Sequence, residues 1–328
     1  MAILVCGGAG YIGSHTVHAL VERGENVIVV DNLQTGHLEA VNTAAAFYRA
    51  DIREAALEKV FDENTIEAVI HFAANSLVGE SVTNPLKYFN NNVGGLQNLL
   101  EVMAKFGVDK IVFSSTAAVY GEPEKIPIVE TDATNPTNPY GESKLIMEKI
   151  MRWVSRANGV RFVSLRYFNA AGALEGGTIG EDHAPETHLI PLILQVPLGR
   201  RDHITIFGTD YPTPDGTCLR DYVHVCDLAE AHILALNYLR DGGASDIFNL
   251  GSGRGFSVKE IIAAAEKVTA RKIKTEIGSR RAGDPAQLIA ASDKARRILN
   301  WTPKFSSVEK IIADAWTWHK NHPAGYVS

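Results

Sequence analysis

In the first half of the chain, short apolar runs alternate with longer segments in which apolar residues recur every three or four positions. Nearly continuous apolar runs are typical of strands buried on both faces, and the longer periodic segments are typical of helices. This alternation predicts an α/β fold, a Rossmann-type doubly wound parallel sheet with helices on both faces. The expected strands cover residues 2–6, 26–31, 46–50, 68–74, 110–116 and 161–167.

Capping signals mark two of the expected helix starts. Asp51 is followed three residues later by Glu54, a pattern typical of a capping box. Asn138 is a good cap, and Pro139 is a good first residue of a helix. The helices of this half are expected over residues 11–23, 51–64, 85–106 and 139–157.

The second half is less regular and predicts a smaller mixed α/β lobe. Residues 170–220 are rich in Gly, Pro and Thr and hold one expected helix near 189–196. Residues 247–251 read as a strand that returns to the main sheet. Capping boxes starting at Ser257 and Ser306 predict two further helices.

A glycine-rich turn links the first strand to the first helix. Gly7, Gly10 and Gly13 allow a tight turn, close approach of backbone amides to a pyrophosphate, and close packing of helix on strand. Asp31 ends the second strand, 18 positions after Gly13. A carboxylate there accepts hydrogen bonds from ribose hydroxyls and repels a 2′-phosphate, so the cofactor is expected to be NAD rather than NADP.

Ligands of such sheets bind beyond the carboxyl ends of the strands. Those ends are expected to meet in one crevice, and they carry residues 7–13, Asp31, 73–74, 114–116 and 167–169.

Tyr140 and Lys144 stand four residues apart on an expected helix, which places both on one face. A tyrosine hydroxyl has an ordinary pKa of about 10, too high for a base at neutral pH. A nearby ammonium favours the phenolate. The pair is therefore a candidate for proton transfer.

Length, charge and cysteine content narrow the class of protein. The 328 residues suggest roughly two domains, and the net charge of -6 without a basic stripe argues against a nucleic-acid partner. No apolar run approaches the ~20 residues that span a bilayer, and no signal peptide is recognisable. The three cysteines lack metal-site spacing. We expect a cytoplasmic protein with no membrane partner and no metal site.

These features together resemble the extended short-chain dehydrogenase/reductases, and within them the 4-epimerases of UDP-hexoses. The resemblance runs over essentially the whole chain. Its most specific part is the loop 206–220, because generic members of the superfamily lack that loop. The other discriminating stretches are 71–74, 78–81, 220–225 and 280–284.

The resemblance implies interconversion of UDP-galactose and UDP-glucose by transient oxidation at sugar carbon 4, with NAD that stays bound. Tyr140 would act as the acid/base at the 4-hydroxyl while hydride leaves carbon 4 and returns to its other face. Lys144 would bind the nicotinamide ribose and lower the pKa of Tyr140. Thr116 would hydrogen-bond the reacting oxygen.

The same resemblance implies two sets of binding residues. In the substrate set, Arg220 and Arg281 would hold the two phosphates, and Asp284 would accept from the uridine ribose. The cofactor set is Gly7, Gly10, Tyr11, Ile12, Gly13, Asp31, Asn32, Asp51, Ile52, Phe72, Ala73, Ala74, Asn92, Ser114, Tyr140, Lys144 and Tyr167. The substrate set is Thr116, Tyr140, Phe168, Asn169, His188, Leu189, Thr205, Ile206, Phe207, Arg220, Tyr222, Arg281 and Asp284.

The expected organisation has two lobes and a homodimer. Residues 1–169, with returning segments near 221–250, form the NAD-binding domain, and residues 170–220 and 251–328 form the UDP-sugar lobe. The helices 85–106 and 139–157 resemble the pair through which the family forms dimers.

Two departures and three alternatives complete the picture. Ser76 stands where the family often has a lysine near the cofactor phosphates. Leu288 aligns with the residue that gates the 2-substituent of the sugar, so acceptance of UDP-N-acetylglucosamine is undecided.

Ala117 and Ala118 follow Thr116 where a 4,6-dehydratase needs an Asp-Glu pair, which argues against dehydration. A 4-epimerase of UDP-xylose or UDP-glucuronate stays open, as does a non-catalytic NAD-sensing module.

Overall fold

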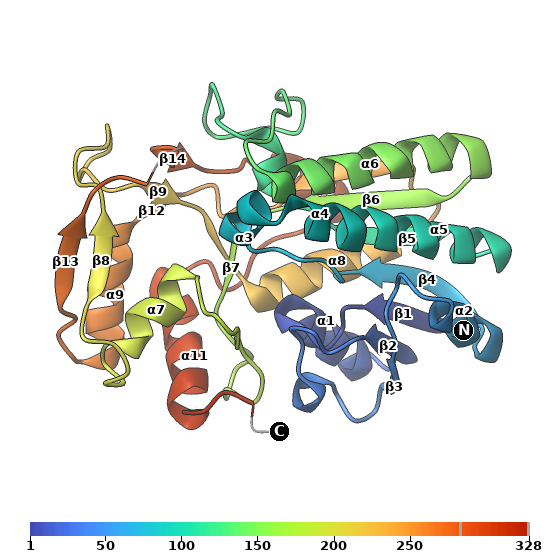
Figure 1. The fold of residues 1–328 in the computed structure, drawn as a ribbon, viewed down its shortest axis with the longest axis horizontal. Coiled ribbons are helices and arrows are strands. Elements are labelled where there is room, and N and C mark those ends of the chain that lie inside the picture. Colours follow the sequence, from blue (N-terminus) through green and yellow to red (C-terminus); the bar gives the residue numbers. More distant parts are fainter. Residues whose placement is uncertain (282–283, 327–328) are drawn as a thin grey trace.

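The computed structural model describes residues 1–281 and 284–326, and its centre is a seven-stranded parallel sheet (Figure 1). The strand order is β11-β6-β5-β4-β1-β2-β3. The order runs outward in opposite directions from β1, which makes a switch point where β1 and β4 meet. The predicted Rossmann-type fold is confirmed. The strands are β1 (Ala2–Cys6), β2 (Val27–Asp31), β3 (Ala46–Arg49), β4 (Ile66–His71), β5 (Lys110–Ser114), β6 (Arg161–Arg166) and β11 (Asp246–Asn249).

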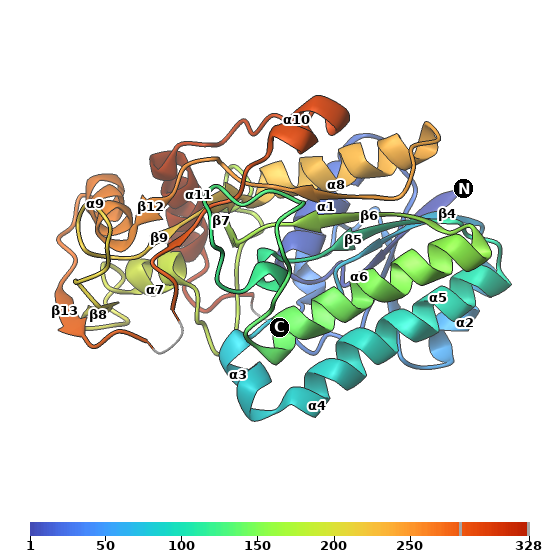
Figure 2. The same cartoon turned by 90° about the horizontal axis from the view of Figure 1, so that it is seen from above.

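Helices cover both faces of this sheet (Figure 2). Alternation along β1 sends Ile3 and Val5 into one core and Leu4 and Cys6 into the other. The first core is closed by α1 (Tyr11–Glu22) and α8 (Val225–Arg240). The second is closed by α2 (Ala56–Glu63), α5 (Gly95–Lys105) and α6 (Pro139–Asn158).

The smaller lobe is mixed α/β, as predicted, and has its own apolar core. The predicted returning strand is confirmed, because β11 pairs with β6 in the main sheet. The short helix α10 (Asp293–Leu299) packs against α8 and β11. The remaining elements of this half are β7 (Asn169–Ala171), α7 (Leu189–Gln195), β8 (Ile204–Phe207), β9 (Leu219–Arg220), β10 (Tyr222–His224), β12 (Phe256–Ser257), α9 (Val258–Thr269), β13 (Thr275–Gly278), β14 (Gln287–Leu288) and α11 (Val308–Asn321).

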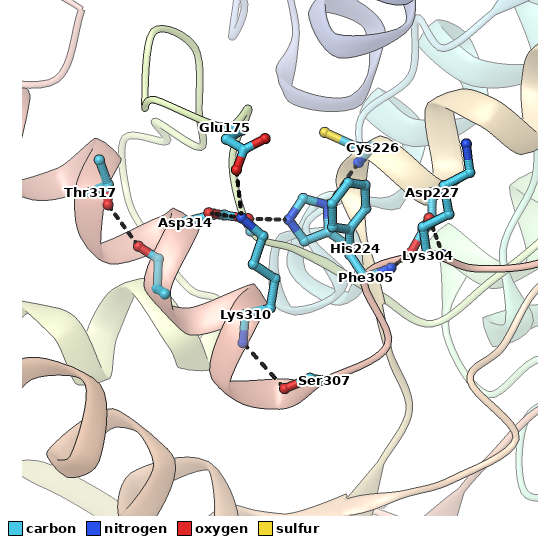
Figure 3. Close-up of polar contacts among 12 residues, drawn as sticks. Glu175, His224, Cys226, Asp227, Lys304, Phe305, Ser307, Lys310, Asp314 and Thr317 are labelled. Carbon is cyan, nitrogen blue, oxygen red and sulfur yellow. Dashed lines mark hydrogen bonds and ion pairs between the residues drawn. The ribbon is translucent and has the colours of Figure 1, made fainter.

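A buried hydrogen bond ties α11 to the start of α8 (Figure 3). His224 Nδ1 accepts from the Cys226 amide at 3.1 Å, so Nε2 carries the proton and donates to Asp314 at 3.1 Å. Lys310 Nζ donates to the same carboxylate at 2.9 Å. Because α8 lies on the main sheet and α11 in the smaller lobe, this contact fastens the two lobes together.

Two predicted helix starts are wrong. The helix after Asp51 begins at Ala56, because the Asp51 carboxylate accepts from the backbone and guanidinium of Arg53 and does not cap a helix. The last helix is capped by Ser307, not Ser306, and Ser307 accepts from Lys310. The caps predicted at Asn138 and Ser257 are confirmed, the latter with a complete capping box.

The helix predicted over 85–106 is not uniform. A turn of α-helix, α4 (Pro85–Tyr88), leads into a π-helical segment (Phe89–Gly94) and then into α5. An extra residue in a helical turn changes which side chains face the core, and such insertions are frequent at functional sites. A short helix, α3 (Val78–Thr83), precedes them.

Among the described residues, no helix is long and apolar enough to cross a bilayer. Of the stretch 280–284, residues 282 and 283 lie outside the described ranges.

Candidate active site

A cavity of about 1140 Å³ opens at the carboxyl edge of the main sheet, where the smaller lobe meets it. It collects most of the residues predicted from the sequence, although they come from strands, helices and loops far apart along the chain. The predicted residues that line it are Gly7, Gly10, Tyr11, Ile12, Gly13, Asp31, Asn32, Asp51, Ile52, Phe72, Ala73, Ala74, Ser114, Thr116, Tyr140, Lys144, Tyr167, Phe168, Asn169, His188, Arg220, Arg281 and Asp284.

Six predicted residues do not line this cavity, and their contacts to a ligand stay predictions. Asn92 is fully buried, where it donates to Ser143 at 2.9 Å and accepts from the Asn75 amide at 2.8 Å. It holds the cavity wall together rather than facing the space. The others are Leu189, Thr205, Ile206, Phe207 and Tyr222.

The glycine turn has no room for side chains. A Cβ on Gly7 would lie 2.5 Å from the Ala73 amide nitrogen, and one on Gly13 would lie 2.1 Å from the Gly7 carbonyl oxygen. Gly10 caps α1 without any side-chain hydrogen bond. The first turn of α1 therefore offers backbone N–H groups and the positive end of the helix dipole to an anion. A dinucleotide pyrophosphate fits this cradle.

Asp31 is fixed by backbone amides at the end of β2. Its carboxylate accepts from Ala9 at 3.0 Å and from Leu33 at 2.8 Å, and it lines the cavity. Asp51, further along, is bound by Arg53, and that guanidinium holds the pKa of the Asp51 carboxyl well below its usual range. Two carboxylates therefore border the region expected for the adenosine half of a dinucleotide. Burial raises the pKa of Asp31, in contrast to that of Asp51.

Tyr140 and Lys144 lie in the first turns of α6, facing the sheet edge. Lys144 is buried, and its Nζ donates to the Ser114 carbonyl oxygen at 2.8 Å and lies 4.8 Å from the centre of the Phe113 ring. Burial lowers the pKa of Lys144 to about 7. Burial also raises the pKa of Tyr140 above its usual value, and a hydrogen bond with Thr116 offsets this only in part. Within the protein alone, burial therefore outweighs any help that Lys144 gives to the phenolate.

A buried polar network below this pair was not recognised from the sequence. Glu148 lies one turn beyond Lys144 and accepts from Ser115 at 2.7 Å and from Arg166 at 2.9 and 2.5 Å. Arg166 also donates to the Tyr120 hydroxyl at 2.8 Å. The sequence did offer a signal for Glu148. It stands four residues after Lys144, so it lies on the same helix face as Tyr140 and Lys144.

The far end of the cavity carries the two predicted arginines. Arg220 forms an ion pair with Asp284, and the guanidinium of Arg281 lies 4.1 Å over the ring of Phe207. Forked guanidinium groups suit phosphate oxygens. Leu288 and Ser76 also line the cavity.

Sequence reasoning missed three polar residues in the wall beside His188. Glu181, His183 and Glu186 all line the cavity. Their spacing with His188, which places two glutamates and two histidines within eight positions, was a readable signal.

The burial of Lys144 predicts a pH-dependent stability. Below about pH 7 folding must bury its charge, whereas the unfolded side chain keeps its proton to about pH 10. The stability deficit is therefore complete below pH ~7 and disappears as the pH rises to ~10. We expect Lys144→Met to raise the free energy of unfolding at about pH 6 by a few kcal/mol, on the order of 1.4 per pKa unit. Urea unfolding measures this.

The matched control is Lys149→Met, on an exposed position of the same helix. It should change stability little at either pH. A gain in Lys144→Met that is equal at pH ~6 and pH ~10 would contradict the assignment of a depressed pKa.

Comparison with known proteins agrees with this geometry. Residues 3–251 match the model of the NAD dependent epimerase/dehydratase family. The chain is 60% identical to a UDP-glucose 4-epimerase of Lacticaseibacillus casei over 99% of both chains. A crystal structure of a UDP-glucose 4-epimerase, 57% identical, superimposes with a TM-score of 0.99 over all of both chains. The UDP-glucose 4-epimerase of Bifidobacterium longum, solved with NAD+ and UDP, is 40% identical, with a TM-score of 0.94 over 99% of this chain and 100% of that one. This chain belongs to the NAD dependent epimerase/dehydratase family.

Proposed function

We propose that this protein interconverts UDP-galactose and UDP-glucose at sugar carbon 4 and keeps NAD bound throughout. The observation that carries the proposal is the placement of Tyr140, Lys144 and Thr116 in the same cavity as a glycine cradle and two arginines. One cavity can therefore hold a dinucleotide and a second, phosphorylated ligand with the candidate base between them. The chain's relatives named above support the same activity.

The protein's own groups account for the proton. Bound NAD supplies the hydride acceptor and a positive charge that favours the Tyr140 phenolate. The Tyr140 oxygen then takes the proton from the sugar's 4-hydroxyl, and it returns the proton to the sugar's 4-oxygen after the sugar has turned. The Thr116 hydroxyl, which already accepts from the Ala118 amide at 3.1 Å, can donate to the sugar's 4-oxygen.

Lys144 positions the cofactor, and its protonation depends on the charge that a ligand brings. Its pKa of about 7 means that the ammonium is only marginally stable, so an acceptor brought by a ligand would favour it strongly. Its bond to the Ser114 carbonyl holds Nζ at the carboxyl end of β5, next to the expected nicotinamide ribose.

The nucleotide must be held firmly and the hexose loosely, or the sugar could not turn. Arg220, Arg281 and Asp284 offer charged contacts to the phosphates and the uridine ribose. The walls near Thr116 are lined instead by small residues, Ala117 and Ala118. This contrast between a charged end and a small-residue end supports a tethered nucleotide with a mobile ring.

The direct test is incubation of the purified protein with UDP-galactose and no added NAD. We expect UDP-glucose to appear, and denaturation to release about one NAD per chain. Release of NAD without any change in UDP-galactose would favour the non-catalytic sensing module, and conversion of only UDP-xylose or UDP-glucuronate would replace the proposed substrate.

Removal of the Tyr140 hydroxyl tests the proton transfer. Tyr140→Phe should lower kcat by roughly 100- to 10,000-fold, because general acid–base catalysis contributes that much. UDP affinity, measured by calorimetry, should stay close to wild type. The control is Tyr238→Phe on α8, outside the cavity lining. Near-normal turnover in Tyr140→Phe would remove this residue from the mechanism.

Truncation of Arg281 tests the nucleotide grip. Arg281→Ala should raise KM by about 10- to 100-fold with a smaller change in kcat, since a hydrogen bond to a charged group contributes ~1.5–3 kcal/mol. Arg280→Ala is the matched control, because the guanidinium of Arg280 is already paired with Asp210. Equal KM values for the two variants would refute the role of Arg281.

We further propose a homodimer formed through the helices beside α6. Large apolar side chains are exposed there, including Leu86 on α4 (77%) and Trp153 on α6 (69%). The two helices pack against each other, and large exposed apolar side chains on adjoining helices are a feature of interfaces. Light scattering should give the mass of two chains, and Leu86→Glu should shift it toward one, whereas Ile277→Glu on β13 should not. A monomeric wild-type protein would overturn the proposal.

A further inference from the structure

Four potential metal ligands converge in the segment that joins β7 to α7. Glu181, His183, Glu186 and His188 each offer one ligand atom, and these atoms all lie within 4.8 Å of one another. They line the same cavity as the glycine turn, and of the four only His188 belongs to the expected substrate set.

The spacing of these atoms suits a small four-coordinate cation. His188 Nδ1 lies 2.7 Å from Glu181 Oε1 and 3.3 Å from Glu186 Oε1. His183 Nδ1 lies 3.3 Å from Glu181 Oε1 and 3.6 Å from Glu186 Oε2. Zinc binds imidazole nitrogen and carboxylate oxygen at about 2.0–2.2 Å in a tetrahedron, whose corners are then ~3.4 Å apart. The observed separations lie on both sides of that value.

Two of the four atoms are buried and make no well-directed hydrogen bond among the described residues. The Glu181 side chain is only 4% exposed, and its Oε1 lies 2.7 Å from His188 Nδ1 and 3.3 Å from His183 Nδ1 without a hydrogen bond to either. A buried carboxylate oxygen that accepts no hydrogen bond is costly. Two such atoms 3.3 Å apart, with no hydrogen bond between them, are an arrangement that a shared cation would satisfy.

The surrounding backbone orients the ligands. Glu186 Oε1 accepts from the amides of Thr187 at 2.7 Å and His188 at 2.8 Å, which fixes its carboxylate. Trp318 of α11 donates to the Glu181 carbonyl oxygen at 3.0 Å. Such contacts to the groups around a metal hold its ligands in place.

We propose that Glu181, His183, Glu186 and His188 form a binding site for one divalent transition-metal ion, with Zn²⁺ the best fit. Two imidazoles select against Mg²⁺ and Ca²⁺, which prefer all-oxygen sites. The sequence predicted no metal site because only the cysteine spacing was considered, and this ligand set contains no cysteine.

The location of the site gives the metal a structural role. The His183 ring lies edge-on to the ring of Tyr11, the first residue of α1, with 6.2 Å between centroids. A metal would therefore fasten the 181–188 segment beside the glycine turn, across the mouth of the expected cofactor site. The link to the cofactor site rests on the proposed function, whereas metal binding by the four side chains does not.

Equilibrium dialysis against Zn²⁺, followed by elemental analysis, tests the site. Wild-type protein should bind about one Zn²⁺ per chain and gain thermal stability. The double variant Glu181→Gln, His183→Gln should lose both effects. The control double variant His203→Gln, Glu276→Gln removes a partly exposed histidine–glutamate pair elsewhere, 3.2 Å apart, and should retain both.

Co²⁺ gives a second readout that does not depend on activity. Four-coordinate Co²⁺ in wild-type protein should show the intense visible absorption of a tetrahedral site, and the Glu181→Gln, His183→Gln variant should not. Circular dichroism establishes that the variant is folded. Less than about 0.2 Zn²⁺ per wild-type chain, or equal binding by the two double variants, would overturn the proposal. Zinc binding without epimerase activity would reject the proposed function and leave the metal site intact.

Discussion

The position of α6 against the carboxyl edge of the sheet depends on a buried polar network, and the rest of the site depends on α6. Glu148 on this helix binds Arg166 of β6 and Ser115 after β5. Arg166 is bound in turn to the Tyr120 hydroxyl, which donates to Asn249 at 2.7 Å. Breaking a buried charge pair by removing one partner costs about 3–5 kcal/mol, because the other charge is left uncompensated.

This network limits where the candidate base can lie. A shift of α6 by one residue would turn Glu148 away from Arg166 and Lys144 away from the Ser114 carbonyl at the same time. Both polar side chains would then be buried without partners. Tyr140, one turn earlier, is therefore held at a fixed height above the sheet edge. Accurate placement of this kind is what proton transfer requires, since small displacements of a reacting group are costly.

In the function proposed above, the two lobes divide the binding of the ligands. The main sheet supplies the glycine cradle, where a side chain at Gly7 or Gly13 would clash with the backbone, and Asp31, which the amides of Ala9 and Leu33 fix. The smaller lobe supplies Arg220 and Arg281. The buried contact between His224 and Asp314 holds the lobes together, so the distance between the two binding regions is set by the fold rather than by either ligand. The catalytic pair lies where the two regions meet.

Local patterns in the sequence predicted the structural features that depend on residues close together in the chain. The strands of the main sheet, the caps at Asn138 and Ser257, and the meeting of Asp31 with the glycine turn all follow from periodicity and the rule that parallel strands end at one edge. What the patterns do not report is which side chain binds which. Asp51 does not cap a helix because Arg53, two positions away, binds its carboxylate. Asn92 donates to Ser143, 51 positions away, and its contact with the cofactor stays a prediction. The raised pKa of Tyr140 arises from burial, which spacing along a helix cannot report.

The central claim is that the hydrogen on sugar carbon 4 leaves and returns to that same carbon, beside Tyr140 at the sheet edge, without exchange with solvent. UDP-galactose carrying deuterium at carbon 4 tests this most directly, with the product analysed by mass spectrometry and NMR after turnover in ordinary water. The account predicts UDP-glucose with the deuterium still on carbon 4. Product that has lost the deuterium to solvent would contradict it.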